Sequence, residues 1–201
     1  MRPSVFLRYG LPALLLVAAC ASSRMDERAV TEARLLGATT PAARVAAVAG
    51  RFRDAGLAPL ARGRFAFGTP PVVAAIVPGH DPILRTELVV LAASLDGPEV
   101  ADVLEAGRLL MERQPDNEPR RSVLVAFWPS GQGVEAGLAS IAAVPVWTDS
   151  SRVATVVVGA ADGPRDVIVS ASDPATVVQV TLDIANRPPA VAADTVAGVP
   201  R

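Results

Sequence analysis

ELVVLAASLDGPEVADVLEAGRLLMERQPDNEPRRSVLVAFWPSGQG, residues 87–133, is the stretch of sequence that decides the fold. It begins with a short apolar run at 87–93 and has another at 122–127, and each run is typical of a buried strand. Between them, residues 98–113 have the spacing of an amphipathic helix. One face of this helix collects the apolar positions, which are Val100, Val103, Leu104, Gly107, Leu110 and Met111.

This order of strand, helix and strand predicts one βαβ unit. Continuous apolar strands joined through a helix pair in parallel, with both faces of the sheet covered and a right-handed crossover. In such sheets, ligands bind just beyond the carboxyl ends of the strands. Two loops lie there, SLDG at 94–97 and WPSGQG at 128–133. Any functional site is therefore expected to be built from these two loops.

The composition is that of one α/β domain. Of the 201 residues, 51% are hydrophobic, which is enough for a sizeable core. The formal net charge is -1 and the sequence has no basic run, so nothing in it attracts a phosphate backbone. Aromatic residues make up 4%, too few for a surface on which bases stack. We therefore expect no nucleic acid among the partners.

The first residues resemble an export signal rather than part of the fold. Arg2 and Arg8 accompany a short apolar run at 11–19, which is well below the roughly 20 residues that a membrane-spanning helix needs. The sequence VAAC, which ends at Cys20, resembles the lipobox of bacterial lipoproteins, in which cleavage leaves an acylated cysteine at the new N-terminus. An ordinary signal peptide cut nearby is the alternative.

We predict a lipoprotein signal peptide at 1–19, lipidation of Cys20, and a tether at 20–28. Cys20 is the only cysteine, so a disulfide within the chain is excluded. Ala21 follows it, which resembles the lipoproteins that are sorted to the outer membrane. The expected location is therefore the cell envelope, with the lipid on Cys20 in the outer membrane and the protein facing the periplasm.

Before the central unit, the sequence predicts a helix and a strand. Thr40 followed by Pro41 marks a helix start, and the helix 42–55 collects Val45, Val48 and Phe52 on one face. An apolar strand follows at 72–77. A tight turn at 78–82 returns the chain to the strand at 87–93, so the two strands are expected to be antiparallel neighbours.

After the central unit, a short helix is expected at 134–143 and a strand at 153–159. Alternating apolar positions predict two further half-buried strands, at 166–171 and 176–184. The tail from residue 187 to residue 201 contains two consecutive prolines and many alanines, and we expect it to be disordered.

Five blocks of sequence resemble, in order and spacing, metallopeptidase family twenty-eight, the co-catalytic di-zinc aminopeptidases. The blocks are GRFRDAGLAPL at 50–60, VVAAIVPGHDP at 72–82, ELVVLAASLD at 87–96, EAGRLL at 105–110 and RRSVLVAF at 120–127. The resemblance implies a shortened form of that family's fold at residues 29–186: a three-layer α/β domain with a mixed, mostly parallel sheet flanked by helices.

The resemblance also implies that the family's zinc site is dismantled. Ser94 stands at the position of the first zinc-ligand histidine, and only the companion aspartate persists, as Asp96. Ser130 and Gly131 stand where the family has paired glutamates, one the general base and the other a ligand. A later ligand aspartate falls near Val156, and the last ligand histidine has no counterpart. A catalytic zinc ion needs about three protein ligands, so we assign no metal ligand, no catalytic residue and no cofactor.

Other polar residues near this region have simpler interpretations. His80 lies in a turn at the other end of the sheet and is expected to be solvated. Glu99, Asp102 and Asp116 lie on or beside the amphipathic helix and are expected on its solvated face. GQGVEA at 131–136 matches a dinucleotide fingerprint, but it comes late in the domain and precedes a short helix. A nucleophilic serine would lack a base within reach.

The leading hypothesis is therefore an exported, lipid-anchored and noncatalytic domain that acts as a binding or scaffold module at the cell envelope. Its partner would be a peptide or an envelope protein, bound in a groove lined by Trp128 and Gln132. The alternative is a divergent zinc-dependent peptidase that recruits ligands from a partner chain or from unexpected carboxylates. Such an enzyme needs carboxylates or histidines that converge near Ser94 and Ser130.

Overall fold

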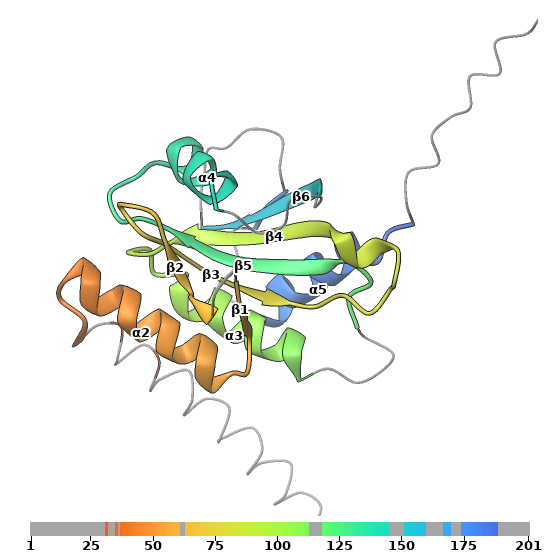
Figure 1. Cartoon of the computed structure of the whole chain (residues 1–201), viewed down its shortest axis with the longest axis horizontal. Helices are drawn as coiled ribbons and strands as arrows, with labels where there is room; N and C mark the ends of the chain where they lie inside the picture. Colours follow the sequence, from red (N-terminus) through yellow and green to blue (C-terminus); the bar gives the residue numbers. More distant parts are fainter. Residues whose placement is uncertain are drawn as a thin grey trace, which may run out of the picture.

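The structure of the chain is a computed structural model (Figure 1). It describes Thr31, Leu35 and residues 37–60, 63–112, 118–144, 151–159, 167–169 and 174–188. At its centre is a seven-stranded sheet. The strands are β1 (Ala58–Pro59), β2 (Ala66–Phe67), β3 (Val72–Val77), β4 (Glu87–Ser94), β5 (Ser122–Trp128), β6 (Ser151–Val158) and β7 (Val167–Val169).

The predicted βαβ unit forms the middle of this sheet. β4 and β5 are parallel neighbours, with Leu88 opposite Ser122 and Ser94 opposite Trp128, and α3 (Val100–Met111) connects them. β6 pairs in parallel with the other side of β4, and β7 pairs in parallel with β6. β3 runs antiparallel to β5 and to the short strands β1 and β2. The sheet is therefore mixed, as predicted, with three parallel pairings among β4 to β7 and three antiparallel pairings made by β3.

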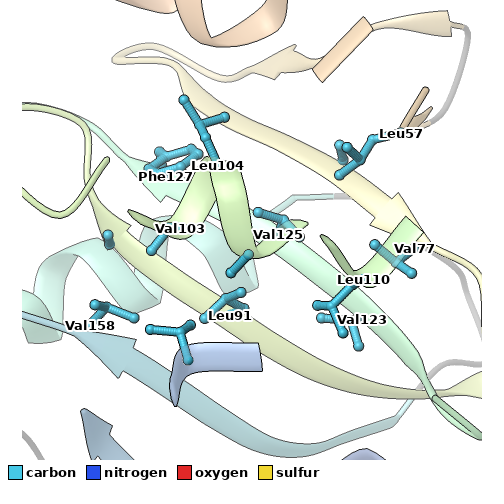
Figure 2. Close-up of a cluster of buried hydrophobic side chains, with 14 of the residues drawn as sticks. Leu57, Val77, Leu91, Val103, Leu104, Leu110, Val123, Val125, Phe127 and Val158 are labelled. Atoms are coloured by element: carbon cyan, nitrogen blue, oxygen red, sulfur yellow. The ribbon is translucent and has the colours of Figure 1, made fainter. Parts of the chain in front are cut away.

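Helices cover both faces of the sheet. α2 (Pro41–Asp54), α3 and α5 (Pro174–Ala185) lie on one face, and α4 (Val134–Ala142) lies on the other (Figure 1). The larger core cluster packs between the sheet and the three helices, where Leu91, Val103 and Val125 are buried (Figure 2). A smaller cluster lies on the α4 side and includes Trp128 and Leu138. This is the three-layer α/β architecture expected from the sequence.

The start of α2 follows its predicted signal. The Thr40 hydroxyl accepts a hydrogen bond from the Ala43 N–H at 3.2 Å, and Pro41 occupies the first turn, where a missing N–H costs nothing. Val48 and Phe52 are buried against the sheet. Just after the helix, Gly56 takes a φ of 71°, a left-handed conformation that favours glycine.

One strand pairing is wrong in the sequence analysis, because β3 is not a neighbour of β4. β5 lies between them and pairs antiparallel with β3. The link 78–86 is long enough to pass over the start of β5. Both ends of this link bond to the side chain of Ser122. The Ser122 hydroxyl accepts a hydrogen bond from the Gly79 N–H at 3.0 Å and donates one to the Arg85 carbonyl at 2.8 Å.

The strand predicted at 176–184 is also wrong, because this segment is helix α5. Its buried positions are Val177, Thr181, Ile184 and Ala185, which have helical spacing. The Thr181 hydroxyl donates to the Val177 carbonyl at 2.7 Å, so the polar group is satisfied inside the helix. The segment is rich in valine and threonine, residues that favour strands, and this hid the helical period.

Asp102 corrects another expectation, since it is only 4% exposed and does not lie on a solvated face. α3 packs against α5 as well as against the sheet, so a larger part of its circumference is buried. The short strands β1 and β2 were not predicted, because the two residues in each are too few to show a pattern.

Several predictions concern residues outside those described. They include the signal peptide, the tether, Cys20, Asp116, and the tail beyond Pro188. Within the described part of the chain, no helix has the length and apolar character needed to cross a membrane.

Candidate functional site

The site lies between β4 and β5, where the helices that follow the two strands lie on opposite faces of the sheet. α3 leaves β4 on one face of the sheet and leads to β5, whereas α4 leaves β5 on the other face and leads towards β6, on the far side of β4. The loops after β4 and β5 therefore separate at their carboxyl ends. In parallel α/β sheets, such a switch point opens the crevice in which ligands bind. These are the two loops that the sequence analysis selected.

Asp96 ties the two loops together. One of its carboxylate oxygens accepts a hydrogen bond from the Ser94 hydroxyl, and the other accepts from the Gly131 N–H at 3.2 Å. The Leu95 N–H also donates to the Trp128 carbonyl at 3.0 Å. Gly131 has a φ of 79°, so a glycine suits the turn that aims this N–H at the carboxylate. Three of the positions predicted from the family resemblance thus meet in one hydrogen-bonded network.

This network stabilises the charged form of Asp96. The Ser94 hydroxyl is the main reason that the pKa of Asp96 is lowered, and the Gly131 N–H and the positive charge of Arg44 act in the same direction. Burial opposes them only in part, because the side chain is exposed. Asp96 is therefore a carboxylate at neutral pH, and its oxygens already accept hydrogen bonds from the protein.

Replacing Ser94 with alanine is expected to raise the pKa of Asp96 towards its ordinary value, because the strongest donor is lost. Carbon-13 NMR of the Asp96 carboxyl group during a pH titration measures this change. Ser140→Ala is the matched control, because that hydroxyl bonds to Gln132 on the other side of the loop. A pKa of Asp96 that stays the same in Ser94→Ala would contradict the network.

The donor set near Asp96 does not fit the zinc ions that the family resemblance implies. Within the described ranges, no three His, Cys, Asp or Glu side chains lie close enough together to hold a metal ion. Val156, at the position of a later ligand, is a fully buried residue of β6. The Ser130 hydroxyl is buried without a hydrogen-bond partner, and Gly131 has no side chain to offer. A catalytic zinc ion needs about three protein ligands.

The side chain of Trp128, at this edge of the sheet, is buried in the core on the α4 side. It is 3% exposed, and its indole N–H donates to the Gln132 carbonyl at 3.2 Å. Its ring lies against Gly137 of α4, where an added Cβ would come within 2.6 Å of the Trp128 Cδ1. The side chain of Gln132 accepts from the Ser140 hydroxyl at 3.0 Å. Both residues predicted for the groove therefore have structural partners in α4 or in its leading loop.

Two cavities open on either side of the loop 95–98. The larger, of about 430 Å³, lies beside α2 and is mostly apolar, with Arg44 and Asp96 as its charged residues. The smaller, of about 280 Å³, lies between the carboxyl ends of β4, β5 and β6. Its lining includes Trp128, Val134 and Val158, and one carboxylate, that of Glu99. These cavities are the concave surfaces at the switch point.

Two residues of this site, Glu99 and Arg44, were not predicted from the sequence. Glu99 was expected on a solvated face, but it is half-buried and lines the smaller cavity. Arg44 was not singled out from the sequence, and it lines the larger cavity. No local signal reveals either, because each side chain reaches the site through packing between segments that are distant in sequence.

His80 lies at the opposite end of the sheet, as predicted. Its Nδ1 is 3.1 Å from the Pro119 carbonyl and 3.9 Å from a Glu118 carboxylate oxygen, and its side chain is 47% exposed. Next to it, Asp81 accepts hydrogen bonds from the N–H groups of Leu84 and Ile83 and from the Arg120 guanidinium. The hydrogen bonds at this end of the sheet connect its loops, and none of these residues lines either cavity.

The Asp81 network is expected to make stability depend on pH. The Leu84 N–H, followed by the Arg120 side chain, lowers the pKa of Asp81 from 3.8 to about 2. The carboxylate therefore stabilises the fold above pH 3.8, and this contribution is lost as the pH falls through 2. Urea unfolding of the wild type and of Asp81→Asn between about pH 6 and pH 2 tests this. The two stabilities should converge as the pH falls, and a constant difference would contradict the prediction.

Comparisons with known proteins give similarities of fold only. No protein-family model matches the chain, and no curated protein matches it. Among solved structures, it is similar to the YXEP protein of Bacillus subtilis, a dinuclear metal-binding peptidase of the M20 family. The TM-score is 0.44 and the identity 12%, over 64% of this chain and 43% of that protein. It is also similar to a protein of Bacteroides vulgatus assigned as a zinc-dependent exopeptidase. Here the TM-score is 0.37 and the identity 13%, over 55% of this chain and 47% of the other. The chain thus spans less than half the length of either protein.

Proposed function

We propose that this chain is an exported, lipid-anchored and noncatalytic binding module of the cell envelope, built on a degenerate and shortened aminopeptidase-like domain related to metallopeptidase family twenty-eight. Its ligand would be a peptide or a segment of an envelope protein. The binding site would be the carboxyl edge of the sheet, around the loops 94–97 and 128–133.

The observation that carries this proposal is the bonding of Asp96. In a peptidase site, this acidic group would have to orient or support a metal ligand. Here its two oxygens are used by Ser94 and Gly131, the residues that replace a ligand and a glutamate in the family resemblance. The replacements therefore form a network of their own, which connects the two loops into one rim.

The concave surfaces beside this rim support a binding role. The two cavities have mostly apolar linings with a few charged groups, and such linings suit the side chains of a bound peptide. A peptide laid across the loop 95–98 would reach both cavities. Binding through such a surface needs no general base and no metal ion.

We expect the chain to be attached to the membrane by a lipid on Cys20. If Cys20 is acylated, the full chain should incorporate labelled palmitate and sediment with the outer membrane. Cys20→Ala should lose the label and become soluble in the periplasm. Equal membrane association of both forms would argue against the lipid anchor and leave the binding role untouched.

An assay for aminopeptidase activity tests whether the chain is noncatalytic. The purified chain is incubated with zinc and a panel of aminoacyl p-nitroanilides, and release of p-nitroaniline is followed. The expected rate equals that of buffer with zinc. A zinc-dependent rate that Asp96→Ala abolishes would favour the alternative, a divergent zinc-dependent peptidase with ligands from a partner chain or from unexpected carboxylates.

A further inference from the structure

The carboxylate of Glu99 has an unusual position for an acidic group at the start of a helix. Glu99 is the N-cap residue of α3, but its side chain makes no capping hydrogen bond. Its backbone carbonyl accepts a hydrogen bond from the Val103 N–H at 3.0 Å. Among the described residues, no N–H, hydroxyl or cationic group bonds to the carboxylate. A half-buried anion without a protein donor is available to bind a ligand cation.

Two glycines allow the carboxylate to lie there. An added Cβ on Gly97 would come within 2.5 Å of the Glu99 Oε2, and one on Gly159 would overlap the carboxyl group. Gly159 also has a φ of 81°, a conformation that favours glycine. The carboxyl group therefore packs against bare backbone from the loop after β4 and from the end of β6. This packing keeps it at the wall of the cavity.

The rest of that cavity suits an alkyl chain. Its apolar walls come from Trp128, Val134 and Val158, with Pro98 beside Glu99. Its volume of about 280 Å³ lies below the usual range for a drug-sized ligand, roughly 300–1,000 Å³. The space therefore suits one long side chain, with its methylene groups along the apolar walls and its charged end at the carboxylate.

We propose that this cavity binds a lysine or arginine side chain of a peptide, with the cation held by Glu99. This inference rests on the proposed peptide-binding function and specifies its chemistry. It makes Glu99, and not the Asp96 network, the group that selects the ligand. The Asp96 carboxylate already accepts hydrogen bonds from the protein, whereas the Glu99 carboxylate makes no capping hydrogen bond.

The test uses three peptides with blocked ends: acetyl-Gly-Gly-Xaa-Gly-Gly-amide with lysine, norleucine or glutamate at the centre. Binding to the purified full chain is followed by NMR, through the amides of Gly97 and Gly159 and the indole N–H of Trp128. The lysine peptide should shift these signals and bind about tenfold or more tightly than the norleucine peptide, because only lysine forms a charge-assisted hydrogen bond. Added salt should weaken the lysine complex.

Glu99→Gln keeps the shape of the side chain and removes its charge, so the lysine peptide should bind about tenfold more weakly. Glu135→Gln is the matched control. It makes the same change of net charge at an exposed residue of α4, next to Val134 but outside the cavity lining. Its affinity for the lysine peptide should stay within about twofold of the wild type. Thermal melting of both variants checks that they are folded.

The outcomes separate this inference from the proposed function. If all three peptides bind equally, or if Glu99→Gln binds as the wild type does, the cation site is wrong and peptide binding stands. A fourth peptide, Gly-Gly-Gly-Gly-Gly-amide with a free amino terminus, offers a cation without a side chain. If it binds at these amides and the blocked lysine peptide does not, the cavity does not select a lysine or arginine side chain. If no peptide binds, both this inference and the peptide-binding role are overturned.

Discussion

Replacing Gly79 with alanine is expected to destabilise the fold by about 3 kcal/mol, the upper part of the range for overpacking a close contact. An added Cβ would lie 2.6 Å from the Arg121 carbonyl carbon and 2.7 Å from the Ser122 N, and closer still to the Arg120 carbonyl oxygen. All three atoms belong to the backbone, so no side chain can rotate away. The link between β3 and β4 would have to move off the start of β5. Equilibrium unfolding in urea measures the loss.

Gly50→Ala is the matched control for this prediction. Gly50 lies within α2, and nothing lies within 4 Å of the position of an added Cβ. Because alanine is a better helix former than glycine, this variant should be more stable by about 0.5–1 kcal/mol. The same chemical change should thus have opposite signs at the two positions. Equal effects of the two substitutions would contradict the close approach at Gly79.

Replacing Arg121 with methionine is expected to cost about 3 kcal/mol, since a half-buried carboxylate and two backbone carbonyls lose their buried donor. Arg121 is 2% exposed, and its Nε donates to the Glu87 carboxylate at 2.5 Å. Its Nη1 donates to the carbonyls of Ala185 and Arg187, at the end of α5. Methionine fills similar space but leaves these acceptors without their donor. The loss is measured by urea unfolding, and by faster amide exchange at the end of α5.

Two further variants separate the charge from the packing. Arg85→Met removes an exposed arginine from the link between β3 and β4, and should change stability by less than about 0.5 kcal/mol. The double variant Arg121→Met with Glu87→Gln should recover part of the loss, because the remaining partner is no longer charged. If the single and double variants are equally unstable, the ion pair with Glu87 does not carry the effect.

The central part of the fold is predictable because its signals are local. β4, α3 and β5 each show a clear apolar pattern, and parallel pairing follows from the helix between the two strands. The pairing of β3 with β5 is not predictable in this way. It joins segments separated in sequence by β4 and α3, and a short link after β3 gives no information about which strand lies beside it.

α5 shows how composition can hide a helix start. Asp173 followed by Pro174 has the same form as Thr40 followed by Pro41, which the sequence analysis used correctly for α2. At the second position this signal was not used, because alternating valines suggested a strand at 176–184. The helical spacing of Val177, Thr181 and Ile184 was equally present.

For the site, the sequence located the loops but not their chemistry. It placed Ser94, Asp96 and Gly131 at one edge of the sheet, and in the structure hydrogen bonds connect these three residues. It did not identify Glu99 as a cavity residue. That depends on Gly159, which comes close only because β6 lies beside β4. The assignment to metallopeptidase family twenty-eight, the lipid anchor and the location remain predictions.

The most direct test of the noncatalytic account is the metal content of the purified chain. The protein is prepared without chelator, offered zinc, dialysed, and analysed by mass spectrometry of the metal, with circular dichroism to check folding. The account predicts a folded chain that retains no zinc. Retention of about two zinc ions per chain, the number for a co-catalytic site, would contradict it and favour the divergent peptidase.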